Sequence, residues 1–437
     1  MIIMLYYEKR KEDLFSSHGH HMIRKPRGTA DILPEEAATW QYIEAKAREV
    51  ACRYGFGEIR VPTFEVTELF SRGVGDTTDV VQKEMYTFTD REGRSLTLRP
   101  EGTASVARAL IENGRCSDPM PLKLFYIINC FRYEKPQAGR SREFYQFGCE
   151  MYGASSPAAD ANIIAMASAF IRELGIENVT LHINSIGCPE CRPAYREALK
   201  NYFKEHEAEL CDTCRQRLES NPLRILDCKS PVCSEIAKDA PKSIDHLCPD
   251  CDAHMKSLTA QLDAMGIDYV IDTNIVRGLD YYTRTVFEFI CPVIGAQSTI
   301  CGGGRYDGLM KELGGPELPG IGFAMGLSRL ILAMNECSKT ITANNSPELY
   351  IAPMGDAAVT KASAICEGLR REGIKAESDL VGRSLKAQMK YADKIGAHYT
   401  LILGDSELES GVAQLKDMTN STQREVRIDE IAAELTK

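Results

Sequence analysis

The sequence lacks three features that would assign it to a specialised class of protein. No apolar run approaches the ~20 residues that a membrane-spanning helix needs. The apolar stretch Met1–Tyr7 is followed by charged residues rather than preceded by them, and no small-residue cleavage site follows it, so it does not predict a signal peptide. Positive charge is not in excess, because the formal net charge is −10. This charge argues against coating of nucleic acid by bulk electrostatics, but it leaves room for an RNA partner contacted over a local patch.

Length and composition predict an ordered protein of more than one domain. A chain of 437 residues is too long for one hydrophobic core, and 44% hydrophobic with 26% charged residues is typical of folded proteins. We interpret residues 1–22, with the histidine cluster His18–His21, as an N-terminal extension that is disordered or an artefact of the start site or a tag. The expected linker Asn344–Pro347 separates a domain at 23–343 from a second one at 348–437.

The distribution of apolar residues predicts strands and helices in both domains. Glu58–Glu65 alternates like a strand, and Pro62 places it at an edge or a strand end. Cys188–Met265 is polar and mostly helical, which is typical of an insertion between the halves of a sheet domain. The glycine-rich stretch Cys301–Gly308 is expected to be a loop. Strands alternate with helices from Leu349 onwards, so the C-terminal domain is predicted to be a small α/β domain.

A polar face on an otherwise apolar hairpin is the first candidate site. Leu124–Tyr133 and Glu143–Tyr152 predict two antiparallel strands joined by the loop Glu134–Arg142. Alternation puts one set of second-strand side chains on the same face: Phe144, Gln146, Gly148 and Glu150. The loop adds the cations Lys135, Arg140 and Arg142. Guanidinium groups above a polar strand face would suit a phosphate-bearing ligand, although a solvated hairpin would show the same pattern.

Three further motifs do not identify a function when each is taken alone. Leu98–Thr103 is a polar turn before a helix, and Val276–Thr285 places two tyrosines between two arginines. Cys301–Gly308 could let the backbone approach a flat or phosphorylated ligand, but it is neither a P-loop nor a dinucleotide-binding fingerprint.

Taken together, these motifs resemble those of the class II aminoacyl-tRNA synthetases, and within that class the histidyl-tRNA synthetase family. The resemblance runs from about Ile23 to the C-terminus. The matching segments follow the family's order: Arg27–Pro62 (motif 1), Phe131–Glu134 with Phe144–Gly148 (motif 2), Arg277–Thr285 and Gly302–Gly308 (two blocks particular to the histidine enzymes), Gly322–Leu330 (motif 3) and Leu349–Lys437 (anticodon-binding domain).

This resemblance implies a fold and a reaction. The fold would be α+β, with a class II antiparallel sheet flanked by helices, a helical cysteine-rich insertion at about 188–265, and an α/β anticodon-binding domain. The reaction would join L-histidine to ATP as histidyl-adenylate, release pyrophosphate, and transfer histidine to tRNA-His. Mg²⁺ would neutralise the pyrophosphate, and motif 1 implies a homodimer.

The resemblance also assigns roles to individual residues. Arg132 and Arg277 would be catalytic, one on each side of the α-phosphate. The implied ATP-binding residues are Arg132, Glu134, Arg140, Arg277 and Arg329. The implied histidine-binding residues are Glu101, Gly102, Thr103, Gln146, Glu150, Tyr281 and Tyr282. A carboxylate and a phenol oxygen suit the two ring N–H groups of a protonated imidazole, and such a polar pocket rejects analogues that leave its groups unpaired.

Cysteines are concentrated in the insertion. Eight of the sixteen lie between Cys188 and Cys251, in a chain that we expect to be cytoplasmic and in contact with no membrane. The cluster contains three C-x₂-C pairs, of which two would make a tetrahedral structural zinc site. We favour Cys188, Cys191, Cys248 and Cys251, because both pairs carry proline after the first cysteine and together they bracket the insertion. Free thiols in a helical insertion are the alternative.

Two other functions compete with the ligase. A non-catalytic paralogue, the regulatory subunit of ATP phosphoribosyltransferase, would resemble the catalytic domain but typically lacks the C-terminal domain and some catalytic residues. Because Arg132, Arg277, Arg329 and the C-terminal segment are all present, the enzyme is favoured. A zinc-dependent interaction protein would explain only the cysteines.

Overall fold

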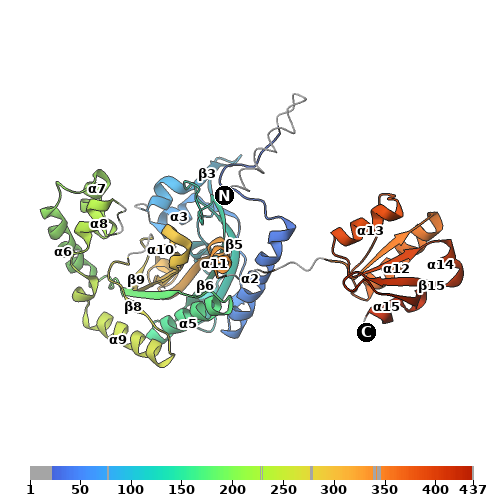
Figure 1. Ribbon diagram of the computed structural model, residues 1–437. Coiled ribbons are helices and arrows are strands. Elements are labelled where there is room, and N and C mark those ends of the chain that lie inside the picture. The colour runs from blue at the N-terminus through green and yellow to red at the C-terminus, as the bar shows by residue number, and fades with distance from the viewer. Residues whose placement is uncertain are drawn as a thin grey trace. The chain divides into compact units, whose positions relative to one another are not determined.

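The computed structural model describes residues 22–75, 78–226, 228, 230–275, 279–337, 341 and 346–435 (Figure 1). Most of the expected N-terminal extension, Asn344 and Asn345 of the expected linker, and Arg277 lie outside these residues. The chain divides into two compact units, Met1–Thr342 and Ala343–Lys437, and each is described by itself. Among the described residues, no helix has the length and apolar character needed to cross a membrane.

An eight-stranded sheet forms the centre of the first unit. Its order is β1-β5-β6-β11-β10-β9-β7-β8, antiparallel from β5 to β7 and parallel at both ends. The strands are β1 (Gly57–Glu58), β5 (Leu122–Phe131), β6 (Glu143–Tyr152), β7 (Thr180–Ser185), β8 (Val270–Ile271), β9 (Thr283–Ile290), β10 (Thr299–Arg305) and β11 (Gly320–Gly326). The predicted hairpin is β5 and β6, with Phe131 opposite Glu143.

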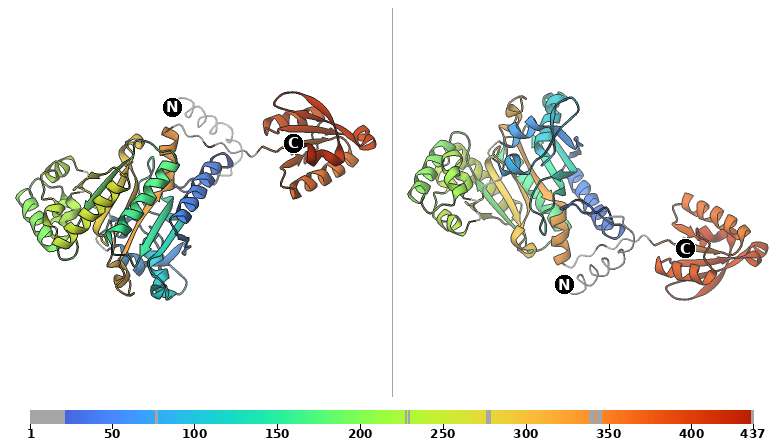
Figure 2. Two further views of the ribbon diagram at one scale, coloured as in Figure 1. Left: turned by 90° about the horizontal axis from the view of Figure 1, so that it is seen from below. Right: turned by 90° about the horizontal axis from the view of Figure 1, so that it is seen from above.

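Helices cover one face of this sheet. They are α2 (Pro34–Arg53), α5 (Pro157–Glu173), α9 (Pro249–Ala264) and α11 (Leu327–Glu336). Figure 2 shows α2, α5 and α9 side by side along the strands. The apolar side chains of β6, among them Phe147, Cys149 and Met151, are buried in the core beneath these helices. The alternate residues of β6 therefore face the other side, where the covering is incomplete.

Shorter elements pack on the second face of the sheet. They are α3 (Thr67–Val74), the π-helical turn η1 (Val80–Glu84), α4 (Thr103–Glu112), η2 (Arg115–Ser117) and α10 (Leu309–Glu312). A small sheet, β2-β4-β3, comprises β2 (Phe64–Val66), β3 (Tyr86–Thr89) and β4 (Ser95–Leu98). Val106 and Leu110 of α4 and Met310 of α10 share a core with Tyr126 of β5. This layer leaves part of the sheet face open.

Two local predictions about strands are wrong. The single strand expected at Glu58–Glu65 is divided between β1 and β2, which belong to different sheets. Pro62 has no N–H to donate to a neighbouring strand, and the Val61 and Pro62 carbonyls accept hydrogen bonds from Arg99 Nη1 at 2.7 and 2.9 Å.

The glycine-rich stretch Cys301–Gly308 is likewise not a loop, because its first half is in β10 at the centre of the sheet. A Cβ at Gly303 would collide with the Gly322 carbonyl and the Phe287 ring. The glycine thus serves close packing between strands.

The insertion between β7 and β8 is helical, as predicted. It contains α6 (Arg192–Glu205), α7 (Asp212–Ser220), η3 (Pro222–Ile225), α8 (Pro231–Ala237), η4 (Ser243–His246) and then α9. After the insertion, the 3-10 helix η5 (Pro292–Gln297) connects β9 to β10. The segment α6 to η4 has a hydrophobic core of its own, separate from that of the sheet.

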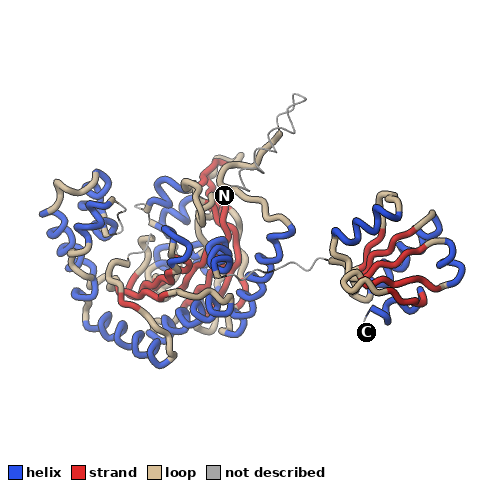
Figure 3. Tube along the Cα trace, in the orientation of Figure 1, coloured by secondary structure: helices blue, strands red, loops and turns tan. Residues whose placement is uncertain are grey.

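The second unit is the predicted α/β domain (Figure 3). Its sheet has the order β13-β12-β14-β15-β16, parallel across the first three strands and antiparallel beyond. The strands are β12 (Leu349–Pro353), β13 (Ala376–Ser378), β14 (Tyr399–Leu403), β15 (Val412–Asp417) and β16 (Gln423–Arg427). The helices are α12 (Asp356–Arg371), α13 (Leu385–Lys394), α14 (Asp405–Ser410), η6 (Ile428–Glu430) and α15 (Ile431–Leu435). Ile351 of β12 packs in one core with α12, and its neighbour Tyr350 packs in another with α13.

Candidate active site

A cavity of about 1000 Å³, with the open solvent at its mouth included, lies over the open face of the large sheet. Its walls come from β6, β10 and β11, from the loop between β5 and β6, and from the segment before β9. Nine of the twelve residues predicted for the site line it: Glu101, Thr103, Arg132, Glu134, Arg140, Gln146, Tyr281, Tyr282 and Arg329. Segments separated by more than two hundred positions in the sequence thus meet in one pocket.

The other three predicted residues are not on the wall. Arg277 lies outside the described residues. Glu150 is buried one layer below the surface of the cavity, with 1% of its area exposed. Gly102 is also buried, and a Cβ on it would come within 2.5 Å of the Tyr126 ring. Gly102 therefore makes room for a neighbouring side chain.

One end of the cavity is cationic. Arg329 of α11 is held by two backbone carbonyls, with Nε 3.0 Å from the Gly139 oxygen and Nη1 2.8 Å from the Thr299 oxygen. Burial, followed by the positive charge of Arg140, lowers the pKa of the Arg329 guanidinium. The repulsion between these cations would be relieved by an anion placed beside them.

Glu134 joins the other two arginines of this end. Its Oε2 lies 3.2 Å from Arg140 Nε, and its Oε1 lies 3.9 Å from Arg132 Nη1. The approach of Glu134 to Arg140 does not have hydrogen-bond geometry, so both buried atoms are without a hydrogen-bond partner. Arg132 Nε donates to the Pro100 carbonyl at 2.9 Å, which holds the Arg132 guanidinium next to the segment that contains Glu101.

The start of α4 contributes an acidic part of the wall. Glu101 accepts hydrogen bonds from the backbone N–H groups of Thr103 and Ala104 at 2.7 and 2.9 Å, and so satisfies two amides of the helix terminus that have no partner within the helix. Burial raises the pKa of the Glu101 carboxyl, and the two amides oppose this shift. The polar turn that looked unremarkable in the sequence is thus the carboxylate end of the cavity.

Glu150 is the centre of a group of hydroxyls beneath that end. Thr103 Oγ1 and the Tyr126 hydroxyl donate to its Oε1 at 2.7 and 3.0 Å, and the Tyr306 hydroxyl donates to its Oε2. Burial raises the pKa of Glu150 to about 8, although the three hydroxyl donors favour the ionised form. A Cβ on Gly322 of the adjacent strand would collide with this carboxyl group, so glycine is required there.

Tyr126 and Tyr306 were missed by sequence reasoning. Tyr126 was an apolar position of the hairpin, but it lies opposite Gly148 in the strand register, and a Cβ on that glycine would collide with its ring. Tyr306 lines the cavity and follows the glycine-rich part of β10. The signal that could have identified Tyr126 is the single glycine on the polar face of β6.

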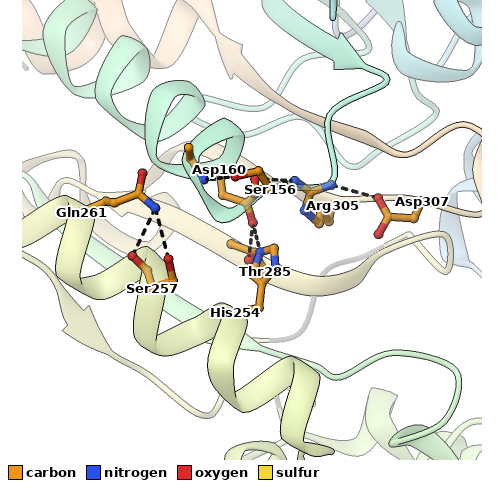
Figure 4. Close-up of polar contacts among 9 residues, drawn as sticks. Ser156, Asp160, His254, Ser257, Gln261, Thr285, Arg305 and Asp307 are labelled. Carbon is orange, nitrogen blue, oxygen red and sulfur yellow. Dashed lines mark hydrogen bonds and ion pairs between the residues drawn. The ribbon is translucent and has the colours of Figure 1, made fainter. Parts of the chain in front are cut away.

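A buried ionic network supports the end of β10 (Figure 4). Arg305 Nη2 donates to Asp160 of α5, and both side chains are fully buried. Asp160 also accepts from Thr285 Oγ1 at 2.6 Å and lies 2.7 Å from His254 Nε2 of α9. Asp307 contacts Arg305 Nη1 at 3.0 Å. The network fixes the residue that precedes Tyr306 in the cavity wall.

The cysteines favoured for zinc meet at the base of the insertion. Cys188, Cys191, Cys248 and Cys251 are close enough for all their Sγ atoms to lie within 4.8 Å of one another. Cys188 Sγ is 3.6 Å from Cys191 Sγ and 3.8 Å from Cys248 Sγ, and the backbone N–H of Cys248 donates to Cys191 Sγ at 3.0 Å. All four are free thiols, and their arrangement fits the donor set of a structural zinc.

Known proteins resemble the chain over nearly its whole length. The family model described as histidyl-tRNA synthetase matches residues 28–330, and the model described as anticodon binding domain matches residues 348–437. A histidine–tRNA ligase of Desulforamulus reducens is 54% identical, covering 93% of this chain and 97% of the relative. One of Acetivibrio thermocellus is 53% identical, with 95% and 99% covered. The crystal structure of apo S. aureus histidyl-tRNA synthetase is 40% identical, with a TM-score of 0.82, covering 95% of this chain and 100% of that one.

Proposed function

Because the chain belongs to the histidyl-tRNA synthetase family, we propose that its cavity is the site where histidine is activated and then transferred to tRNA. The chain is a class II histidine–tRNA ligase, and the reaction uses ATP. The observation that carries the residue assignment is the polarity of the cavity. Arg140 and Arg329 lie near each other, and Glu101 and Thr103 lie at the start of α4. Arg132 lies between these two groups, in contact with Glu134 and with Pro100.

In the first step, a carboxylate oxygen of histidine attacks the α-phosphorus of ATP. A new P–O bond forms while the bond to pyrophosphate breaks, and the leaving group carries away the electron pair. Fixed cations at the phosphorus lower the barrier, because negative charge accumulates there in the transition state. We assign this role to Arg132 and to Arg277.

We assign binding of the outer phosphates of ATP to Arg140 and Arg329, which supply two further guanidinium groups. Mg²⁺ bound with the triphosphate would neutralise the charge of the departing pyrophosphate. Glu134 fits such an ion, because it lines the cavity and its Oε2 has no hydrogen-bond partner among the described residues.

We assign histidine recognition to the start of α4 and the residues around it. Glu101, Thr103 and Gln146 would hold the α-ammonium, and Tyr281 and Tyr282 would line the imidazole pocket. Gly102 admits the Tyr126 ring beside this pocket.

We place Glu150 in the same recognition site as a residue that orients hydroxyl groups. Because its two oxygens accept from Thr103, Tyr126 and Tyr306, it fixes which way those hydroxyls point. A fixed set of buried polar groups rejects analogues that leave them unpaired.

In the second step, a hydroxyl of the terminal ribose of tRNA-His attacks the carbonyl of the adenylate, and AMP leaves. We assign recognition of the anticodon to the second unit, which matches the anticodon-binding domain. The presence of this domain and of full-length ligase relatives disfavours the regulatory subunit of ATP phosphoribosyltransferase. Because its tRNA substrate is used in translation, we propose that the protein acts in the cytoplasm.

We further propose a homodimer. Its interface would include the small sheet, because Phe64, Val66 and Phe88 expose large apolar side chains there. Exposed apolar residues gathered on one element are typical of protein interfaces. Analytical ultracentrifugation should give about twice the mass of the chain, and a Phe64→Glu variant should shift the equilibrium toward monomer.

Zinc at Cys188, Cys191, Cys248 and Cys251 completes the proposal. It would be structural, since four thiolates leave no open position for a substrate. The zinc ion would join the start of the insertion to its end. It would thereby fix the positions at which α6 and α9 leave the sheet domain.

ATP–pyrophosphate exchange, run with each of the twenty amino acids in turn, tests the assignment of the cavity. We expect exchange with histidine alone, and its loss in Arg132→Ala and Arg277→Ala. Arg94→Ala is the matched control, because Arg94 is an exposed arginine outside the cavity. Full exchange by Arg132→Ala would refute the assignment of the phosphate end.

A further inference from the structure

A second group of four cysteines lies in the distal part of the insertion. Cys211, Cys214, Cys228 and Cys233 have all their Sγ atoms within 4.8 Å of one another. They share no member with the group at the base of the insertion. All are free thiols, and Cys214 and Cys233 are buried.

The spacing and the supporting elements are those of a metal knuckle. The first pair is C-x₂-C, with Cys211 just before α7 and Cys214 in its first turn. The second is C-x₄-C, with Cys228 between η3 and α8 and Cys233 within α8. Separations of two to four residues within each pair are typical of tetrahedral zinc sites.

The distances fit a tetrahedron of sulfurs. Zn–S bonds of about 2.3 Å require sulfur atoms about 3.8 Å apart at the corners of a tetrahedron. Cys211 Sγ lies 3.8 Å from Cys228 Sγ. The backbone N–H of Cys211 donates to Cys233 Sγ at 3.3 Å, and that of Ser230 donates to Cys228 Sγ at 3.5 Å. Backbone amides directed at sulfur stabilise the thiolate form that binds metal.

The size of the surrounding core explains why a metal would be needed. The core of α6, α7 and α8 includes Tyr195, Leu199, Phe203, Leu218 and Ile225, and it is separate from the core of the sheet. Two of its buried members, Cys214 and Cys233, belong to the cysteine group itself. A helical segment of this size buries too little apolar surface to be stable without a metal, a disulfide or a partner.

We propose that Cys211, Cys214, Cys228 and Cys233 bind a second structural zinc, which organises the distal part of the insertion. All four ligands come from the protein, so the site is closed to substrate. The insertion would then hold two zinc ions, one where it leaves the sheet domain and one in the middle of its own core.

This second zinc would also fix a contact with the active-site segment. Arg224 of η3 lies 3.2 Å from Asp280, directly before the cavity residues Tyr281 and Tyr282. Arg217 of α7 lies 3.3 Å from Asp79. Both arginines lie on elements next to the four cysteines, so loss of the metal would release these contacts.

Zinc stoichiometry of the purified full-length protein, measured by mass spectrometry after dialysis against metal-free buffer, tests the proposal. We expect two zinc ions per chain. Cys211→Ser/Cys214→Ser should retain one, and Cys188→Ser/Cys191→Ser should also retain one. Cys116→Ser/Cys337→Ser is the matched control, because neither residue belongs to a cysteine group, and it should retain two.

The two sites can fail separately. One zinc per chain that is lost only with Cys188→Ser/Cys191→Ser would overturn the second site and leave the first. One zinc that is lost only with Cys211→Ser/Cys214→Ser would support the second site and overturn the first. A metal-free protein would overturn both.

Cobalt substitution keeps the test valid if a cysteine variant fails to fold. Wild-type protein refolded with Co²⁺ should take up two equivalents, with the intense visible absorption of tetrahedral thiolate coordination. Saturation of the folded wild type at one equivalent would refute the presence of two zinc sites in the insertion.

Discussion

Replacement of Asp160 by asparagine is expected to destabilise the catalytic unit strongly. Asp160 and Arg305 form an ion pair in which both side chains are fully buried. The variant keeps the size of the side chain but removes its charge, so the guanidinium stays in the core with Asp307 as its remaining counter-ion among the described residues. Breaking a buried pair by removal of one partner typically costs about 3–5 kcal/mol. Because Asp307 remains 3.0 Å from Arg305, we expect the lower end, about 3 kcal/mol.

Asp307→Asn is the matched control, because it removes the other negative charge that contacts the Arg305 guanidinium. The Asp307 side chain is 30% exposed, so its pair with Arg305 is partly solvated and should contribute about 0–1 kcal/mol. Trp40, the single tryptophan of the chain, packs against Tyr145 at a ring distance of 5.1 Å and reports on the catalytic unit alone. Urea unfolding followed by Trp40 fluorescence should show a large loss for Asp160→Asn and a small one for Asp307→Asn. Equal shifts of the two unfolding midpoints would show that burial does not determine how much the Asp160–Arg305 pair stabilises the fold.

Three other substitutions test separate parts of the site. Burial raises the pKa of Glu150 from 4.5 to about 8, so between these values the carboxyl is protonated in the folded state and ionised in the unfolded chain. Wild-type stability should therefore fall as pH rises from about 5 to 8, by up to about 1.4 kcal/mol per pH unit, and Glu150→Gln should remove this slope in urea titrations. Arg329→Ala should raise the KM for ATP in pyrophosphate exchange about tenfold or more, because charged hydrogen bonds to phosphate are worth about 1.5–3 kcal/mol. The KM for histidine should change little. An equal rise in both KM values would contradict the assignment of Arg329 to the phosphates. Gly148→Ala should displace the Tyr126 ring and raise the KM for histidine, whereas Gly368→Ala, with no atom within 4 Å of the added carbon, should leave it unchanged.

The hairpin shows what alternation in a sequence can predict. Phe147, Cys149 and Met151 were expected in the core because they share one face of a strand, and they are buried there. Alternation alone did not distinguish a functional site from a solvated surface on the opposite face, with Gln146 and Glu150, and this face is directed to the side of the cavity. Period-two patterns predict faces well because the strand imposes that period on every side chain.

Other elements could not be predicted because their cause lies far away in the sequence. The break at Pro62 depends on Arg99, which supplies donors to two carbonyls from another segment. Strand β16 has one buried residue, Val426, so its sequence carries no amphipathic signal. It forms because β15 offers an edge to pair with. The pair of Asp160 and Arg305 joins residues 145 positions apart, and no local pattern indicates such a contact.

The cationic end of the cavity is better explained by a bound anion than by the stability of the fold. Arg132 and Arg140 share the carboxylate of Glu134. Among the described residues, Arg329 donates hydrogen bonds only to backbone carbonyls, and the buried Nε of Arg140 makes no hydrogen bond. Such an arrangement costs free energy until an anion occupies it. ATP should therefore raise the melting temperature of the wild type, by an amount equivalent to about 2.7 kcal/mol at a concentration of 100 times its Kd. Arg140→Ala should be at least as stable as the wild type without ATP and should gain less from ATP. If the variant were less stable without ATP and gained as much with it, Arg140 would be a structural residue.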